Sequence, residues 1–495
     1  MDAAALPSKA FDPGRDAEDG TLDPPDWDVA AAIGHRIVDD AVRYLRDVRE
    51  RPVWQPMPEQ VEAFFRAPLP EGPTRIDQVY GMVRDTVLAY PMGNIHPRFW
   101  SWYMGAGNFT GALGDFIAAV QNSNLGGGRH AAALLDQQVV GWLRDMVGLP
   151  PSASGTLVSG GSMANLVGLT VARNAMAGID LREHGVAALE RPMRYYASDQ
   201  VHSCHRKAVE TLGLGNCALR RVPADAGGRI DIEALRAAIA QDRAAGFHPA
   251  CLIGTAGTVN SGAVDDLDRL ADIAAEEKLW FHVDGCIGAL IAIAPRNAWR
   301  VKGIERADSI ALDPHKWLHA PFEVGCALIR DRARHRNTFA ASPEYLQTTA
   351  RGIASADWLY EFGLQTTRGF SALKVWMALM EHGVVKFGRL IDRNIAQAAY
   401  LAGLIRAQPS LELMAEPEIN IVCFRVTPRG RDEEQVKRIN VEIMLRLQET
   451  GIAALSDTTI RGRHCLRVAI CNHRTRFGDL SRLLSEIAAI MPAGA

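Results

Sequence analysis

The segment from Ser309 to Leu318, Ser-Ile-Ala-Leu-Asp-Pro-His-Lys-Trp-Leu, is the most informative part of this sequence. Ile310 to Leu312 predict a short buried strand. The strand ends at Asp313 and Pro314, because proline cannot donate to a sheet ladder. Lys316 therefore lies just beyond a strand end, which is where ligands bind in open α/β sheets. A lysine desolvated there is a candidate for Schiff-base chemistry.

Strand-like and helix-like segments alternate from about residue 155 onwards. Seven segments have the pattern of strands: 156–158, 194–197, 218–222, 250–254, 279–283, 309–312 and 325–329. Helical patterns separate most of them. This alternation predicts an α/β fold with a mostly parallel sheet and helices on both faces.

The segments on either side of this region have different patterns. Helices are predicted from Asp28, over 59–66 and over 76–89; they have no sheet of their own, so we expect them to pack on a partner subunit. After a helix at 371–382, strands at 418–426, 453–456 and 465–471 alternate with helices at 432–449 and 475–490. We expect an N-terminal arm with helices over 1–105, a large domain over 106–395 and a small α+β domain over 396–495.

Composition excludes several classes of protein. The 495 residues carry a net charge of −3, with 22% charged and 48% hydrophobic residues, an ordinary globular balance without a basic face for nucleic acid. The longest apolar run, about nine residues, is too short to span a membrane, and the first residues do not resemble a signal peptide. Eight cysteines without CxxC pairs argue against structural zinc and disulfides, and favour a reducing cytoplasm.

Other strand ends carry residues with chemical potential. Ser-Gly-Gly-Ser at 159–162 follows a strand and opens a helix, so free N–H groups and the helix dipole favour an anion such as a single phosphate. Asp284 ends a strand 32 residues before Lys316, where it can hold a protonated ring nitrogen. His202 and Thr258 follow two further strands. Because these strand ends converge on one edge of the sheet, we expect one shared site.

An aromatic cluster lies upstream of the sheet, between Phe99 and Tyr103. It fits core packing and the wall of a pocket for a flat substrate equally well.

Four motifs together resemble the group II pyridoxal-phosphate-dependent decarboxylases, the family of aromatic-L-amino-acid, tyrosine, histidine and glutamate decarboxylases. They are Ser-Gly-Gly-Ser at 159–162, Asp-Gln-Val-His-Ser at 199–203, His-Val-Asp-Gly at 282–285 and Asp-Pro-His-Lys-Trp-Leu at 313–318. The resemblance runs from about Asp28 to the C-terminus. It implies pyridoxal 5'-phosphate as cofactor, the fold type I architecture, and a homodimer whose active sites lie at the subunit interface.

The resemblance also implies catalytic roles. Lys316 looks like the Schiff-base lysine, Asp284 like the partner of the pyridine nitrogen, and His202 like the imidazole stacked on the cofactor ring. Tyr345, in Ser-Pro-Glu-Tyr-Leu at 342–346, looks like the tyrosine of a mobile loop that returns a proton to the substrate.

Binding roles follow in the same way. Further cofactor contacts are implied for Gly161, Ser162, Thr258, Asp313 and His315. Substrate contacts are implied for Trp102, Tyr103 and Arg467. Two positions depart from the family: Asp313 stands where relatives often have asparagine beside the phosphate, and Met163 where many have glutamate.

The sequence thus predicts an enzyme, a carboxy-lyase that converts an L-amino acid to its amine and CO2, and Trp102 and Tyr103 favour an aromatic substrate. Two alternative activities are compatible with the same fold. One is decarboxylation of an acidic or diamino substrate such as glutamate, aspartate or 2,4-diaminobutyrate, and the other is a decarboxylating aromatic aldehyde synthase. A third, of another class, is a protein that binds the cofactor without turnover. Neither nucleic acid nor a membrane is an expected partner.

Overall fold

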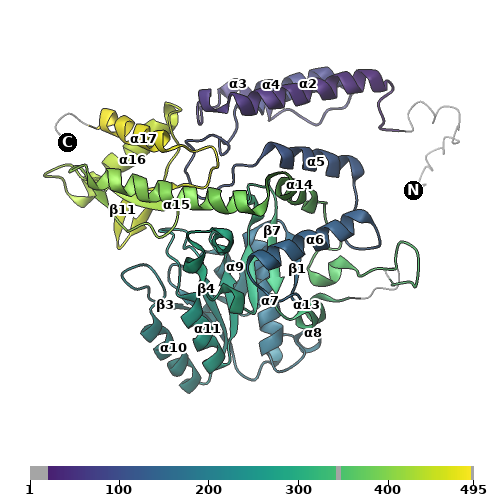
Figure 1. Cartoon of the computed structure of the whole chain (residues 1–495), viewed down its shortest axis with the longest axis vertical. Helices are drawn as coiled ribbons and strands as arrows, with labels where there is room; N and C mark the ends of the chain where they lie inside the picture. The colour runs from purple at the N-terminus through teal and green to yellow at the C-terminus, as the bar shows by residue number, and fades with distance from the viewer. Residues whose placement is uncertain (1–20, 342–346, 492–495) are drawn as a thin grey trace, which may run out of the picture. The chain divides into compact units, whose positions relative to one another are not determined.

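The computed structural model describes residues 21–341 and 347–491, and its contacts divide the chain into two compact units (Figure 1). The smaller unit contains Met1–Glu50 and Met57–Pro91, and the larger contains Arg51–Pro56 and Met92–Ala495. The domain boundaries expected at residues 105 and 395 stay predictions.

Helices make up the smaller unit: α2 (Trp27–Arg46), α3 (Glu59–Phe64) and α4 (Ile76–Thr86), with a 3-10 turn at Val48–Glu50. They begin within one residue of their predicted starts. The Asp26 side chain caps α2 by accepting the N–H groups of Asp28 and Val29. Tyr80 of α4 donates a hydrogen bond of 2.6 Å to Asp40 of α2. No residue of α2 is fully buried, and its apolar residues Val29, Ile37, Val38 and Val42 are exposed.

Seven strands form the main sheet of the larger unit, in the order β1-β7-β6-β5-β4-β2-β3. They are β1 (Ser154–Val158), β2 (Met193–Ser198), β3 (Leu219–Val222), β4 (His248–Thr255), β5 (Trp280–Asp284), β6 (Ser309–Leu312) and β7 (Gly325–Ile329). Strand β7 runs antiparallel to both of its neighbours, β1 and β6, and the pairs among β2, β3, β4, β5 and β6 are parallel. The predicted seven-stranded, mostly parallel sheet is confirmed.

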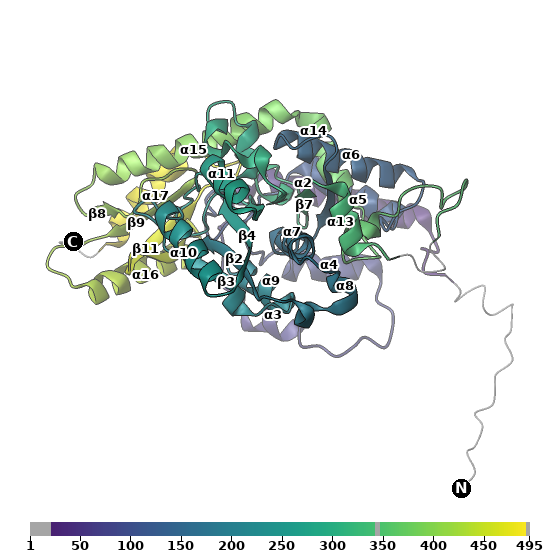
Figure 2. The ribbon, with the colours of Figure 1, turned by 90° about the horizontal axis from the view of Figure 1, so that it is seen from below.

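Helices cover both faces of this sheet (Figures 1 and 2). Those that contact its strands are α6 (Ala131–Met146), α7 (Gly161–Met176), α9 (Cys204–Thr211), α10 (Ile232–Ala244), α11 (Leu267–Glu277) and the short α12 (Pro314–Trp317). The other helices of this region are α5 (Phe109–Gln121), α8 (Leu181–His184), α13 (Arg332–Phe339) and α14 (Ala372–His382), of which α14 packs on α5 and α6. Successive strand residues point to opposite faces. Accordingly, Cys251 and Ile253 of β4 pack in one buried cluster with α7 and α9, while Leu252 between them packs in another with α10 and α11.

A second sheet of four antiparallel strands, in the order β10-β11-β9-β8, lies in the C-terminal part. Its elements are β8 (Leu411–Leu413), β9 (Ile421–Val426), α16 (Glu433–Glu449), β10 (Ser456–Ile460), β11 (Arg463–Ala469) and α17 (Phe477–Ile490). The predicted α+β character is confirmed. The strand predicted at 453–456 was wrong in position: β10 begins at Ser456, and Ala454 instead forms an isolated bridge with Phe99.

Helix α15 (Val384–Arg406) joins the two sheets (Figure 1). Phe387 and Ile391 pack in the core of the main sheet, whereas Leu401 and Ile405 pack in the core of the C-terminal sheet. Among the residues described, no helix has the length and apolarity needed to cross a membrane.

Candidate active site

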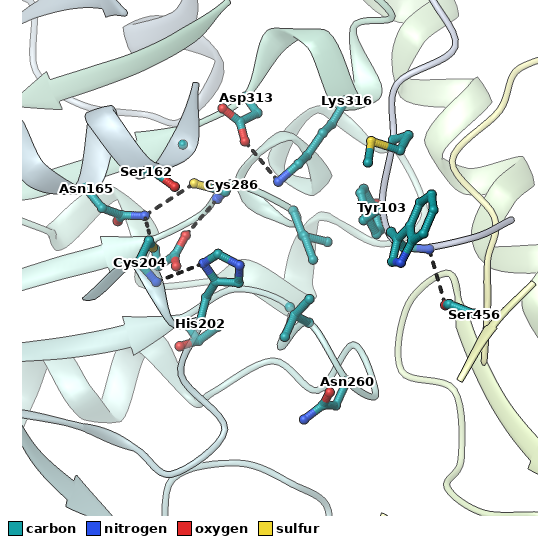
Figure 3. A pocket seen from close by; sticks show the side chains of 18 of the residues that line it. Tyr103, Ser162, Asn165, His202, Cys204, Asn260, Cys286, Asp313, Lys316 and Ser456 are labelled. Carbon is teal, nitrogen blue, oxygen red and sulfur yellow. Dashed lines mark hydrogen bonds and ion pairs between the residues drawn. The ribbon is translucent and has the colours of Figure 1, made fainter. Parts of the chain in front are cut away.

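A pocket of about 430 Å³ lies where β2, β4, β5 and β6 end and α7 begins (Figure 3). This volume falls in the range of small-molecule sites. Ten of the residues expected to form a site line it: Trp102, Tyr103, Gly161, Ser162, His202, Asp284, Asp313, His315, Lys316 and Arg467. The strand ends therefore converge as predicted.

Two expected residues are not part of this lining. Thr258 is fully buried, and its hydroxyl group contacts Ser261 Oγ at 3.1 Å and the Ala263 N–H at 3.0 Å. It stabilises its own loop, and the nearby Thr255 lines the pocket in its place. Thr258 therefore does not line the pocket, contrary to the expectation from the sequence. Tyr345 lies outside the described residues.

Lys316 reaches the pocket from α12, whose first residue is Pro314. Proline favours this position because the first N–H of a helix needs no partner within it. Lys316 Nζ lies 2.9 Å from Asp313 Oδ2 and 5.6 Å from the centre of the Tyr103 ring. Burial lowers the pKa of Lys316, but Asp313, with Cys286 and Asp284, more than offsets this and raises the pKa above its ordinary value. The nitrogen is therefore a cation.

Asp284 ends β5 with both carboxylate oxygens engaged. Oδ2 lies 2.8 Å from His205 Nε2, and Oδ1 accepts the Cys286 N–H at 3.2 Å. Burial favours the neutral acid, but the hydrogen bond and charge of His205 dominate and hold the pKa of Asp284 below its usual range. An ionised carboxylate only accepts hydrogen bonds, so His205 Nε2 carries a proton. His205, on α9, was missed in the sequence, although it lies only three residues after the predicted site residue His202.

A network of polar side chains ties β5, the strand that ends at Asp284, to the neighbouring elements. His282 of β5 contacts Ser309 Oγ at 2.7 Å and Asn165 Oδ1 at 2.8 Å. Burial lowers the pKa of His282 to about 3, so its ring is neutral. The Asn165 amide in turn donates to the Cys204 and Cys286 sulfur atoms, both at 3.5 Å (Figure 3). Asn165 belongs to α7 and so links that helix to the strand that carries Asp284.

His202 lies in the loop between β2 and α9 and is oriented by the backbone. Its Nδ1 accepts the Cys204 N–H at 3.2 Å. Partial burial lowers the pKa of His202, and this effect exceeds the opposing influence of Asp284. The ring is therefore neutral at physiological pH, which suits contact with a flat aromatic ligand.

The N-terminus of α7 forms an anion-binding corner. The first N–H groups of a helix have no partner within it, and the helix dipole favours negative charge there. A Cβ atom on Gly161 would lie 2.4 Å from Cys286 Sγ and 2.7 Å from Asp313 Oδ2, so only glycine allows this close approach. Ser162 adds a hydroxyl group, and His315 lines the same corner with Nδ1 donating to the Val324 carbonyl at 2.7 Å.

The opposite wall contains aromatic residues and a buried guanidinium. Trp102 has φ of +53°, a strained conformation for a bulky residue, and its N–H donates to Ser456 Oγ at 3.2 Å. Arg467 Nη1 donates to the Trp102 carbonyl, and Nε to the Val259 carbonyl at 2.9 Å. Arg467 Nη2 is buried without a hydrogen-bond partner in the described residues. A guanidinium N–H group left unsatisfied beside a pocket is suited to bind an anionic ligand group.

These features fit pyridoxal 5'-phosphate. The corner at Gly161 accommodates a phosphate, Asp284 a protonated ring nitrogen, and Lys316 an aldehyde carbon. A lysine, a carboxylate and an anion corner at one edge of a mostly parallel sheet define the class of fold type I enzymes that use this cofactor.

A family model described as the pyridoxal-dependent decarboxylase conserved domain matches residues 58–427. The chain belongs to this family. It is a pyridoxal-phosphate-dependent amino-acid decarboxylase, as its motifs indicated.

Known proteins resemble it over most of its length. It is 32% identical over 464 residues to an aromatic-L-amino-acid decarboxylase of Bacillus atrophaeus, covering 92% of this chain and 94% of that protein. It is 30% identical over 423 residues to an L-2,4-diaminobutyrate decarboxylase of Rhizobium meliloti, covering 85% of this chain and 83% of that protein. A crystal structure of Oryza sativa TDC with PLP and tryptamine matches with a TM-score of 0.87 at 28% identity, covering 95% of this chain and 99% of that one.

Proposed function

We propose that this decarboxylase acts on an aromatic L-amino acid and releases the corresponding amine and CO2. The observation that carries this proposal is the apolar part of the pocket lining, which includes the rings of Trp102 and Tyr103 and the side chain of Ile287. Aromatic rings pack favourably on such surfaces. The similarity to the Bacillus atrophaeus and Oryza sativa proteins points the same way.

Several residues prepare the cofactor side of this site. When bound, the cofactor supplies a ring that accepts the electron pair left behind as CO2 departs. Lys316 holds its aldehyde carbon, and Gly161 and Ser162 hold its phosphate. The ionised Asp284, kept so by His205, holds a proton on the ring nitrogen and thereby makes the ring a better electron acceptor.

Arg467 orients the substrate in this proposal. Its unpartnered Nη2 binds the α-carboxylate, while Trp102 and Tyr103 hold the side chain. Fixing both ends of the substrate would hold the bond to the carboxylate in the orientation for cleavage and so select it over the other bonds of the α-carbon. Tyr345 is proposed, from its sequence motif alone, as the acid that protonates the α-carbon after CO2 has left.

The proposal also includes a homodimer. Helix α2 buries no residue, and Phe116, Ile117 and Val120 of α5 expose apolar surface that a second subunit can cover. Sedimentation velocity at micromolar protein tests this: a dimer is expected, and a monomer contradicts it. All eight cysteines are free thiols, which supports a reducing compartment such as the cytoplasm.

Asp457 favours a second candidate substrate, 2,4-diaminobutyrate. It lines the pocket and is half-exposed, although His464 Nε2 lies 3.0 Å from its Oδ2. A carboxylate at this position can pair with a second amino group on the substrate. The similarity to the Rhizobium meliloti protein gives this candidate its support.

The test is amine and CO2 release by the purified protein with added cofactor. The panel contains tyrosine, DOPA, tryptophan, phenylalanine, histidine, glutamate, aspartate and 2,4-diaminobutyrate. We expect amine from one or more aromatic substrates alone. Turnover confined to 2,4-diaminobutyrate or an acidic substrate contradicts the role given to Trp102 and Tyr103, and aldehyde with ammonia contradicts simple protonation.

A further inference from the structure

Asp313 and Lys316 form an ion pair inside the pocket. Asp313 Oδ2 lies 2.9 Å from Lys316 Nζ, and the two side chains are only 3% and 15% exposed (Figure 3). The first turn of α12 brings the two residues together, and the Lys316 N–H also donates to the Asp313 carbonyl at 3.0 Å. A charge pair this well buried is weakly screened by solvent.

The Asp313 carboxylate depends on this partner. Its Oδ1 accepts no hydrogen bond from any residue that the structure describes. Although Asp313 precedes α12, its side chain does not cap the helix. Gly161 and Gly325 enclose it: a Cβ atom on either would lie 2.7 Å from Oδ2 and 2.9 Å from Oδ1, respectively. A buried carboxylate with so few hydrogen bonds is costly unless a cation faces it.

Other titratable groups also face Lys316. They come from the surrounding loops and helices and are Asp284, Cys286, His202, Cys204, His315 and Cys471. The other carboxylate, Asp284, already accepts hydrogen bonds from His205 and the Cys286 N–H. Asp313 is therefore the carboxylate in direct contact with Nζ.

We propose that Asp313 is the counter-ion of the Lys316 nitrogen, both while it is a free ammonium and after it has joined the aldehyde carbon of the cofactor. The step conserves charge: an ammonium and an aldehyde give a protonated C=N group and water. Two of the three N–H protons leave with the carbonyl oxygen, and one stays on the nitrogen. The carboxylate thus faces a positive nitrogen before and after the step.

This arrangement prepares the site for its substrate. A protonated C=N carbon is a better electrophile than a neutral one, so it is attacked more readily by the amino group of an incoming amino acid. The inference rests on the proposed function, because it requires the cofactor on Lys316. It assigns Asp313 to the lysine, whereas the family resemblance implies a contact with the phosphate.

The test is a pH titration of the absorption band of the protonated C=N group in the cofactor-loaded protein. The variants are Asp313→Asn, which removes the charge at constant shape, and Asp313→Glu, which keeps it. For D313N we expect the titration midpoint to fall by at least about one pH unit, a tenfold loss of proton affinity. For D313E we expect a midpoint nearer to that of the wild type. Asp313→Ser removes the charge in another way if D313N does not fold.

The outcomes separate the two proposals. A wild-type protein that gains no such band contradicts the proposed function itself. If the wild type gains the band but D313N and D313S keep its midpoint, the counter-ion role is overturned while the proposed function stands. Tighter cofactor binding by D313N with an unchanged midpoint would place the carboxylate beside the phosphate instead. A folded D313N protein that cannot load the cofactor also overturns the inference.

Discussion

His205 shows how a single buried hydrogen bond can set the charge of a catalytic group. Replacement by leucine removes the donor to Asp284 Oδ2, whereas glutamine can place an amide N–H close to the position of Nε2. A hydrogen bond to a charged group is worth about 1.5–3 kcal/mol. We therefore expect His205→Leu to weaken cofactor binding about ten- to hundredfold, with His205→Gln between it and the wild type. Fluorescence titration with the cofactor measures this.

A structural effect alone would lower the stability of both variants without this order in affinity. Equal cofactor affinity for the wild type, H205L and H205Q would contradict the role of His205 in keeping Asp284 ionised for cofactor binding.

Tyr345 gives a second prediction at the residue scale. Without its phenolic proton, the electron pair on the α-carbon persists longer and other reactions compete. In air-saturated buffer, where dissolved dioxygen takes up the two electrons that aldehyde formation releases, we expect Tyr345→Phe to lower amine yield at least about tenfold and to raise the share of aldehyde. Chromatography of both products measures the ratio. An unchanged ratio of amine to aldehyde means that another group supplies the proton.

Residues that follow buried strands could be predicted from the sequence, because strand ends at one edge of a sheet share a site. Lys316, Asp284 and His202 all belong to this group. His205 could not be predicted in this way, because it lies inside a helix and its partner comes 79 residues later. Thr258 follows a strand too, but its hydroxyl group is used by its own loop. A position directly after a strand places a residue at the edge of the sheet where the site lies. Local hydrogen bonds then determine whether its side chain points into the pocket.

At the scale of elements, the start of α7 must approach the loops after β5 and β6 closely. Gly161→Ala adds a Cβ atom that overlaps with Cys286 Sγ and Asp313 Oδ2. Forcing an extra carbon into a packed site costs about 1–3 kcal/mol. Since these neighbours line the pocket, we expect cofactor affinity to fall about ten- to hundredfold, as measured by equilibrium titration.

The matched control is Gly403→Ala in α15, where a Cβ atom meets nothing within 4 Å. This change removes backbone freedom from the unfolded chain and is expected to stabilise the protein by up to about 1 kcal/mol without altering cofactor affinity. Wild-type cofactor affinity in the G161A protein would contradict the close approach.

The main elements were predictable because buried strands and amphipathic helices have different periods. Strand β6, with all four residues buried, was predicted with the bounds it has. Strand β8 was missed because three residues carry too little pattern. The segment 453–456 is apolar because Ala453 and Leu455 are buried in the core of the C-terminal sheet, and its pairing with Phe99 depends on a distant part of the chain.

At the scale of the whole molecule, buried neutral histidines make folding sensitive to acid. Burial lowers the pKa of His335 from 6.5 to about 3, and that of His473 from 6.5 to about 4. Between these values and 6.5 the unfolded chain binds protons that the folded chain does not. Their stabilising contribution is therefore complete above pH 6.5 and is lost as the pH falls through this window.

A variant isolates one such group. His335→Gln removes a proton-binding site from the unfolded chain, so between about pH 6 and pH 4 the wild type should lose about 1.4 kcal/mol per pH unit relative to H335Q. Urea unfolding at a series of pH values measures the difference. A constant offset caused by altered packing does not affect this slope, and parallel curves would contradict the neutral, buried state of His335.

The proposed function of the whole molecule requires that the Lys316 nitrogen carries the cofactor. Borohydride reduction of the cofactor-loaded protein converts a C=N bond into a stable amine, and peptide mass spectrometry then locates the added group. We expect one pyridoxyl phosphate group on the peptide that contains Lys316, and its loss in a Lys316→Arg protein that remains folded. Labelling of another lysine, or no labelling under conditions where amine is produced, would contradict it.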